Sequence, residues 1–273
     1  MNIRIKRIIS TILMAMIVMT LIGCGGKITP KTMMSKVGKN LTKVTSFSNH
    51  VDMDIKMEDV VRYTKVTMDM EMENTMDPKA GHAKGTAEFV MGGVNLSSEL
   101  EIYQVTEGKE QITYSGMDGE WIMEKAEPQQ GKLALGNNLL SEMGDSIDQF
   151  QLAKSTIELN GKECYEMYGD VSGKELMGVL GSQMLHGFGL VEIPADDLVA
   201  DLKIPIIFDV YKEKMLPARM IVDMTEVLNQ LFDQLGERTE VTHYEIKLQF
   251  QSYDEVGKIQ VPEEIKNKAK GDE

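Results

Sequence analysis

The chain of 273 residues is poor in cysteine and in aromatic residues, and each scarcity excludes a class of protein. It has two cysteines, Cys24 and Cys164, so at most one disulfide can form and a disulfide-stapled scaffold is excluded. Phe, Trp and Tyr make up 6% of the residues, which is too few for a stacking platform that binds glycans. Packing of the core must therefore stabilise the protein almost alone.

Sequence motifs for catalysis are also scarce. The chain contains four isolated histidines, none in a His-Glu-x-x-His pair: His50, His82, His186 and His243. No Gly-Lys is followed by Ser or Thr, so a phosphate-binding P-loop is excluded. The tripeptide Gly144-Asp145-Ser146 resembles the nucleophile block of one esterase family. An esterase built on Ser146 would require a sharp turn and a histidine and an acid nearby in space.

Positive charge is the third scarcity. The chain has 29 Lys and Arg against 43 Asp and Glu, a formal charge of −14. Because residues 1–23 contain three basic residues and no acidic one, the chain from Cys24 onward carries −17. Phosphate backbones and anionic headgroups repel such a protein, which excludes nucleic acid as a partner and argues against electrostatic attachment to membranes.

The N-terminus carries the one long uncharged apolar run, residues 8–22. Basic Arg4, Lys6 and Arg7 precede it, and Gly23 and Cys24 follow it. This arrangement resembles a bacterial lipoprotein signal peptide. The resemblance implies that residues 1–23 are removed, that Cys24 receives a diacylglycerol, and that the protein stays anchored to the extracytoplasmic face of the cell membrane. The alternative is an uncleaved membrane helix, although the run is shorter than the roughly 20 residues of a typical span.

Residues 24–29 predict a lipidated cysteine with a short tether, and the periodicity after them predicts one domain over residues 30–265. Apolar residues at helical spacing indicate a helix over 30–44. A strict alternation then predicts strands over 47–57 and 66–72, followed by strands near 83–91, 94–105, 109–115 and 121–125. Neighbouring long strands favour an antiparallel sheet. The tail, residues 266–273, has almost no apolar residue and is predicted to be disordered.

The second half of the chain alternates helical and strand patterns. Asn160-Gly161 predicts a hairpin between residues 155–159 and 162–171, and Cys164 in its second strand is expected to be a small buried side chain rather than a reactive thiol. Helices are predicted over 135–147, 173–186 and 227–235. Strands are predicted over 204–212, 216–224 and 239–253, with a short strand reaching Val261 before a final helical turn.

Four local patterns carry a resemblance to a known superfamily. They are Val44-Thr45-Ser46-Phe47, Met117-Asp118-Gly119-Glu120-Trp121, Phe208-Asp209-Val210-Tyr211 with Pro217-Ala218-Arg219, and residues 253–264. With the order of elements, they resemble the bacterial lipoprotein carriers and mycobacterial lipid-binding lipoproteins, in particular a branch of Gram-positive surface lipoproteins. The resemblance implies an α+β fold in which a strongly curved antiparallel sheet of about eleven strands forms an open half-barrel. It also implies helices over the concave face, and acyl chains bound between sheet and helices.

Methionine is unusually abundant, with 22 residues in the chain. Three interpretations compete: ordinary core filling, an adaptable lining for a flexible acyl ligand, and a thioether site for Cu(I). Neighbouring inward positions on a strand lie about 6.8 Å apart, which makes a single ion hard to share along one strand. The candidates for a ligand lining are Met53, Met57, Met68, Met70 and Met72.

The leading hypothesis from the sequence is a non-enzymatic lipoprotein, held to the membrane through Cys24, that binds a hydrophobic ligand such as a lipid. It includes no metal, no cofactor and no catalytic residue, and it leaves protein partners open. The alternative from another class is a tethered protein-interaction or envelope-sensing module without a ligand. The runs Asp52-x-Asp54 and Asp69-x-Glu71 lack the glycine-containing loop of a calcium site and are expected on a solvated face.

Overall fold

A single large sheet dominates the computed structural model, which describes residues 28–60, 62–108, 110–126, 146–180 and 196–271. Thirteen strands pair in the order β13-β6-β5-β4-β3-β2-β1-β12-β11-β10-β9-β7, with β8 paired to β9. All pairs are antiparallel except β13 with β6. The fold is therefore α+β with an open antiparallel sheet, as the resemblance implies.

Ten of these strands are long, and three span only two or three residues. The first six are β1 (Ser46–Glu58), β2 (Tyr63–Met76), β3 (Lys79–Met91), β4 (Val94–Glu107), β5 (Glu110–Met117) and β6 (Glu120–Ala126). The others are β7 (Gln151–Leu152), β8 (Ile157–Leu159), β9 (Lys162–Ser172), β10 (Lys203–Tyr211), β11 (Leu216–Asp223), β12 (Glu240–Tyr253) and β13 (Lys270–Gly271). The alternating patterns of the sequence thus predict the long strands to within a few residues at each end.

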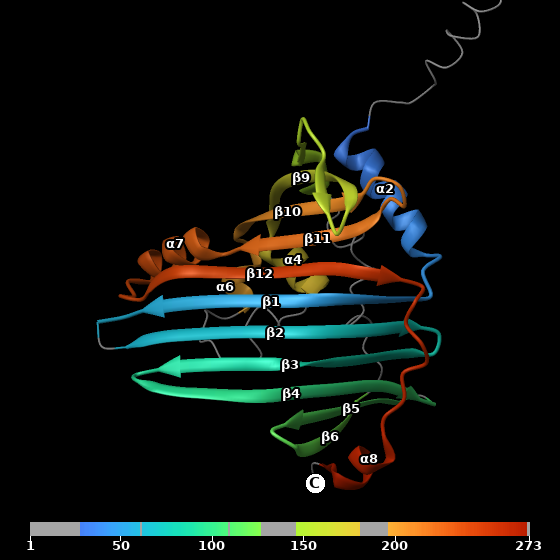
Figure 1. Cartoon of the computed structure of the whole chain (residues 1–273). Helices are drawn as coiled ribbons and strands as arrows, with labels where there is room; N and C mark the ends of the chain where they lie inside the picture. The colour runs from blue at the N-terminus through green and yellow to red at the C-terminus, as the bar shows by residue number, and fades with distance from the viewer. Residues whose placement is uncertain (1–27, 61, 109, 127–145, 181–195, 272–273) are drawn as a thin grey trace, which may run out of the picture.

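The sheet is curved, and both of its ends recede from the viewer in Figure 1. Two helices lie behind it on the concave side, α4 (Gly173–Leu180) and α6 (Asp196–Ala200). Helix α2 (Pro30–Leu41) lies beside β11 at one edge, and α7 (Thr225–Leu235) contacts β12. A short 3-10 helix, η1 (Ser146–Gln149), and α8 (Glu263–Lys268) complete the described elements.

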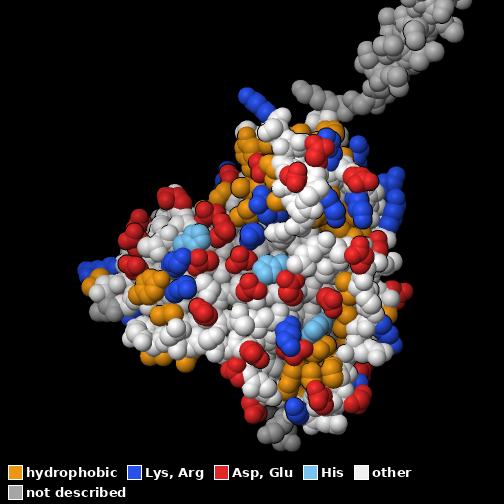
Figure 2. Space-filling view, in the orientation of Figure 1, with side chains coloured by type: hydrophobic (Ala, Val, Ile, Leu, Met, Phe, Trp, Pro, Cys, Tyr) orange, Lys and Arg blue, Asp and Glu red, His pale blue; other side chains and the backbone are white. Residues whose placement is uncertain are grey.

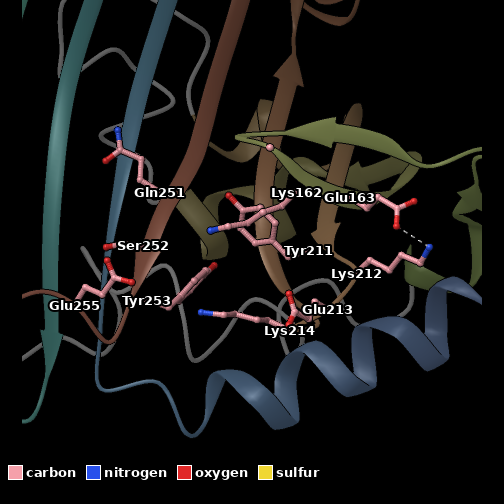
Figure 3. A pocket seen from close by; sticks show the side chains of 11 residues that line it. Lys162, Glu163, Tyr211, Lys212, Glu213, Lys214, Gln251, Ser252, Tyr253 and Glu255 are labelled. Atoms are coloured by element: carbon pink, nitrogen blue, oxygen red, sulfur yellow. Dashed lines mark hydrogen bonds and ion pairs between the residues drawn. The ribbon is translucent and has the colours of Figure 1, made fainter.

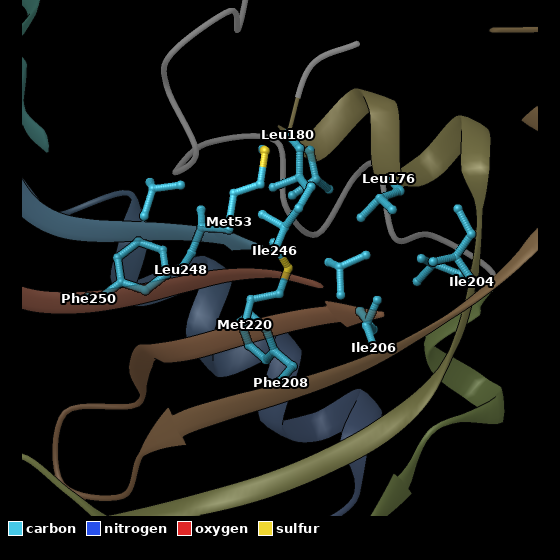
Figure 4. Close-up of a cluster of buried hydrophobic side chains, with 14 of the residues drawn as sticks. Met53, Leu176, Leu180, Ile204, Ile206, Phe208, Met220, Ile246, Leu248 and Phe250 are labelled. Carbon is cyan, nitrogen blue, oxygen red and sulfur yellow. The ribbon is translucent and has the colours of Figure 1, made fainter. Parts of the chain in front are cut away.

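The core lies between the concave face and α4. Leu176 and Leu180 of α4 point toward the sheet, where Met53 of β1 and Ile246 of β12 lie opposite them (Figure 4). All four side chains are at most 5% exposed. Because the inward residues of β1 and β9–β12 meet side chains from the helix, this half of the concave face is filled by the protein itself.

Two local sequence signals have the conformation that they predict. Asn160 and Gly161 have φ values of 52° and 70° and join β8 to β9, as a two-residue hairpin requires. Gly236, with φ of 71°, ends α7 in the left-handed conformation, which glycine adopts without the steric cost of a Cβ atom.

Two predictions for the C-terminal segment are wrong. No strand is present among residues 254–262, where a short strand reaching Val261 was expected. The prediction of disorder from residue 266 onward is wrong for residues 266–271, because α8 continues to Lys268 and Lys270–Gly271 pairs with β6. Val261 and Ile265 anchor this segment on the convex face against Tyr103, Ile112 and Tyr114.

Some predictions lie outside the described residues. These are the signal segment, Cys24, most of the helix over 135–147 and the end of the helix over 173–186. Within the described part of the chain, no helix combines the length and the hydropathy that a membrane span would need.

Candidate functional site

An apolar cavity of about 640 Å³ opens on the concave face over strands β2 to β6. Its lining is mostly hydrocarbon and includes Met68, Phe89, Leu100, Ile102 and Ile122. This is the size and character of sites that bind small hydrophobic ligands, which are typically 300–1,000 Å³. The cavity lies on the half of the sheet away from the strands over which α4 packs.

Small residues dominate the inward face of β3, and one of them, Ala87, lines the cavity. The inward positions of β3 are Gly81, Ala83, Gly85 and Ala87, four positions in succession without a large side chain. Larger side chains face them from the neighbouring strands, so β3 forms a trough between β2 and β4. A sheet face built in this way cannot fill the volume above it with its own side chains.

Gly85 is required by the sheet geometry as well. A Cβ atom added at Gly85 would collide with the backbone carbonyl oxygen of Asp69 on β2. Close approach of two backbones is one of the reasons for glycine inside a strand. The trough is therefore a consequence of backbone packing and not only of short side chains.

The register brings two of the five candidate methionines to the cavity. Met68 lies opposite Ala87, and Met70 lies opposite Gly85, and both methionines line the cavity. Met53, Met57 and Met72 are buried in the core cluster, away from the cavity lining. Contact of any of the five with a ligand stays a prediction, as does the Cu(I) alternative.

Sequence reasoning missed most of the lining, which comes from β3 to β6. The signal that could have identified it is the alternation of Gly and Ala at four successive inward positions of one strand, next to strands with large apolar residues. Leu96, Met117 and Ile122 on the same face are 58%, 54% and 49% exposed. Exposed apolar side chains that are contiguous are typical of binding surfaces.

Among the described residues that line the cavity, one carboxylate is the only ionisable group. Glu120 lies at the rim, opposite Met117, and is exposed. Ser98 and Ser115 add two hydroxyls, and no lysine, arginine or histidine takes part. The lining therefore offers apolar contact and a few hydrogen bonds, and it offers no positive charge to a ligand acid group.

The geometry around Ser146 differs from that of an esterase. The Ser146 hydroxyl donates to a carboxylate oxygen of Glu175 at 2.6 Å. Glu175 also accepts from the backbone N–H and the hydroxyl of Ser172, at 2.7 Å each, which forms a capping box for α4. Of the described histidines, His50, His82 and His243 lie on the convex face of the sheet, so none of them can act as a base for Ser146.

A family model described as "Family of unknown function (DUF6612)" matches residues 29–270. The chain belongs to this family. Among curated proteins no significant sequence match was found. The match of the DUF6612 family covers the whole described region, including the strands that form the cavity.

Three solved structures are similar to this DUF6612 protein at low sequence identity. Mycobacterium tuberculosis lipoprotein LppX shares 11% identity and a TM-score of 0.47, covering 84% of this chain and 97% of its own. LprF from Mycobacterium bovis shares 11% identity and a TM-score of 0.47, covering 85% and 96%. A DUF1329 family protein from Desulfovibrio piger has 10% identity, a TM-score of 0.25 and coverage of 84% and 95%.

The convex face of the sheet is polar, as the alternation predicts. Figure 2 views this face, on which histidines lie among acidic side chains. A ring nitrogen of His50 lies 2.9 Å from Glu71, and one of His82 lies 2.9 Å from Glu101. The described residues contain no group of three His, Cys, Asp or Glu side chains that could hold a metal ion. These histidines form cross-strand polar pairs.

A second cavity, of about 440 Å³, lies between the β8–β9 turn, the β10–β11 turn and the end of β12. Figure 3 shows its charged lining, in which Lys212 pairs with Glu163 at 3.1 Å. The ammonium of Lys162 lies 5.2 Å from the centre of the Tyr211 ring. Since three lysines and three glutamates line it, this cavity lacks the apolar character that an acyl chain needs.

Cys164 lies near these turns and is fully buried. Burial raises the pKa of its thiol to about 11, which leaves almost no thiolate at neutral pH. The structure thus agrees with the expectation of a small buried side chain at this position.

Proposed function

We propose that this DUF6612 protein is a lipid-anchored lipoprotein of the extracytoplasmic membrane face, non-enzymatic, that binds an acyl chain or another hydrophobic ligand in the cavity over β2 to β6. The observation that carries the proposal is an apolar cavity of about 640 Å³, lined by Ala87 of β3 and by large apolar side chains of the neighbouring strands. Removal of residues 1–23 and acylation of Cys24 are part of the proposal.

The physical basis is the unfilled apolar surface. Burial of hydrocarbon contributes about 0.8 kcal/mol for each methylene, so an acyl chain of ordinary length gains substantially from the cavity. Flexible thioether side chains such as Met68 and Met70 can adapt to chains of different shape. The Ser146 hydroxyl is bound to the capping carboxylate of Glu175, and no described histidine lies beside it, which supports binding rather than hydrolysis.

The charge of the rim favours one ligand class. Glu120 would repel a free fatty acid carboxylate, and no positive group on the lining would compensate. A ligand with an uncharged head, such as a diacylglycerol, avoids this repulsion. We therefore infer that esterified or neutral lipids bind better than fatty acids at neutral pH.

Native mass spectrometry of residues 24–273 with Cys24→Ser, produced without the signal segment, tests the proposal. We expect co-purified lipid, or uptake of added diacylglycerol. The variants Ala87→Phe and Ser98→Phe place a ring in the trough and should abolish uptake. The matched controls Thr86→Phe and Ser97→Phe lie on the neighbouring outward positions of the same strands and should leave uptake unchanged.

The rim is tested separately. Glu120→Gln should increase fatty acid affinity by roughly twofold to fivefold, the range for one exposed charge pair, and should leave diacylglycerol affinity unaltered. A folded protein that takes up neither ligand would overturn the binding proposal and favour the interaction module. Mass spectrometry of the protein purified from membranes tests the anchor, and a chain that still begins at Met1 would refute it.

A further inference from the structure

Acidic residues are absent from the N-terminal part of this acidic protein. The first acidic residue is Asp52, so residues 1–51 contain only positive charges, and all 43 carboxylate side chains follow. After the predicted cleavage point, five lysines precede Asp52: Lys27, Lys31, Lys36, Lys39 and Lys43. The net charge of the molecule therefore conceals a basic segment next to Cys24.

Helix α2 converts this segment into a basic surface. Its apolar residues Met33, Met34 and Val37 are at most 1% exposed and pack into the core. Lys36 and Lys39, with Lys43 just beyond the helix, are exposed. At 100° per residue Lys36 and Lys39 lie about 60° apart around the helix, and Lys43 follows two residues after its last residue, Leu41. We call these three residues the α2 lysine face.

The α2 lysine face has no counter-charge among the described residues. Lys31 pairs with Asp148 at 2.9 Å, but no ion pair involves Lys36, Lys39 or Lys43 in the described part of the chain. Positive charge that no protein carboxylate neutralises is available to an external anion.

The position of the anchor decides which anion is within reach. Five residues, 25–29, separate the start of α2 from the lipidated cysteine, and six extended Cα–Cα steps span at most about 20 Å. In Figure 1 the chain enters α2 at the end of the molecule opposite α8. An anchored domain therefore holds α2 close to the lipid headgroups, within a few Debye lengths of about 8 Å.

We propose that the α2 lysine face binds anionic phospholipid headgroups and orients the anchored domain, with α2 toward the membrane and α8 away from it; this rests on the anchoring of Cys24. Each lysine near an anionic surface strengthens attachment by roughly fivefold. The acidic remainder of the domain is repelled by the same surface. Attraction at one end and repulsion elsewhere together select one orientation.

Energy transfer on vesicles tests this orientation. The mature lipidated protein, carrying Ser35→Cys labelled with a donor dye, is reconstituted into phosphatidylcholine vesicles with a headgroup acceptor, with or without 30% phosphatidylglycerol, roughly a physiological anionic fraction. Ser35 lies exposed on α2, and buried Cys164 does not compete for the dye. We expect transfer to rise at least about twofold with phosphatidylglycerol and to lose this rise at 1 M salt, where the Debye length is about 3 Å.

Two charge variants control the experiment. Lys36→Glu with Lys39→Glu and Lys43→Glu should abolish the rise. Lys125→Glu with Lys174→Glu and Lys203→Glu changes net charge equally at exposed sites on β6, α4 and β10 and should preserve it. A second donor site, Ser97→Cys on β4, should show no rise.

The outcomes separate the two proposals. A protein whose mass shows no acyl group contradicts the anchor itself. An acylated protein whose transfer at residue 35 is the same on neutral and anionic vesicles contradicts the lysine-face proposal alone. Equal loss of the rise in both charge variants would also overturn it, because net charge and not the α2 lysine face would then be responsible.

Discussion

At the scale of single residues, Asp209 carries the most unusual environment in the described chain. Its side chain is fully buried on β10, one carboxylate oxygen lies 2.7 Å from Nε of Arg219, and the other has no hydrogen-bond partner. Burial raises its pKa to about 6, although the hydrogen bond and charge of Arg219 act to lower it. Asp209 thus holds Arg219 in place at a cost that depends on pH.

This cost predicts a pH dependence with a definite sign. The pKa of Asp209 is higher in the folded state than in the unfolded state, so the folded protein binds more protons than the unfolded protein between about pH 4 and pH 6. The free energy of unfolding therefore falls as pH rises through that window. The variant Asp209→Asn lacks this titration. From pH 4 to pH 7 the free energy of unfolding of the wild type should fall by on the order of 2 kcal/mol relative to that of the variant. Urea unfolding at the two pH values measures this difference. A constant difference would contradict the assignment.

Gly85 predicts a second residue-scale effect. Since a Cβ atom would collide with the Asp69 carbonyl, Gly85→Ala must separate β2 from β3 and should cost about 2–4 kcal/mol of unfolding free energy. Gly257 is the matched control, because an added Cβ meets nothing within 4 Å there and its φ is ordinary. Gly257→Ala should change stability by less than about 0.5 kcal/mol. If Gly85→Ala and Gly257→Ala change stability equally in thermal unfolding, the close approach of β3 to the Asp69 carbonyl does not require glycine at position 85.

At the scale of elements, the sequence predicts the long strands well because one face of the sheet is buried and the other is solvated. The alternation in Val51, Met53 and Ile55 against Asp52 and Asp54 is therefore strong. The same reasoning fails for the C-terminal segment. Its few apolar residues, Val261 and Ile265, gain their burial from distant strands β4 and β5, which no local pattern contains.

The candidate site was harder to predict than the strands. Alternation identifies which residues point inward, but a ligand cavity depends on what fails to fill the space above them. Met53 and Met68 are paired neighbours on the same face, yet only Met68 lines the cavity, because α4 packs above Met53 (Figure 4). The difference comes from helix placement and from the Gly and Ala positions of β3.

Helix α4 provides the prediction at this scale. Burial alone would raise the pKa of Glu175, but hydrogen bonds from Ser146 and Ser172 outweigh it and hold the pKa below its usual value. Glu175→Gln should therefore cost about 1 kcal/mol at pH 7. A lowered pKa means that this stabilisation is present above about pH 4.5 and is lost as pH falls further.

Urea unfolding of Glu175→Gln and of the wild type at pH 7 and at pH 3 measures the difference in unfolding free energy at each pH. Glu226→Gln in the first turn of α7 is a suitable control, since Glu226 accepts one hydrogen bond, from exposed Gln230 at 3.1 Å. Its effect should stay below about 0.5 kcal/mol. A Glu175→Gln penalty that persists at pH 3 would assign the effect to packing rather than to the charged capping box.

At the scale of the whole molecule, the concave face has two unequal halves. Over β1 and β9–β12 the protein fills the space itself with α4, and over β2–β6 it leaves an apolar cavity. The strands of the second half also carry several exposed large apolar side chains, including Leu96 and Met117. A ligand would complete this half only, so it should stabilise the sheet unevenly.

Hydrogen exchange with and without a bound neutral lipid measures this asymmetry. At a ligand concentration of about 100 times Kd, the free energy of unfolding rises by about 2.7 kcal/mol. We expect added protection in peptides from β3, β4 and β5, and little change in β9–β11. In Ala87→Phe, with its trough occupied by the ring, the lipid should add no protection anywhere. Equal protection of both halves would place the ligand elsewhere, since only contact with the trough explains a response confined to the strands that surround it.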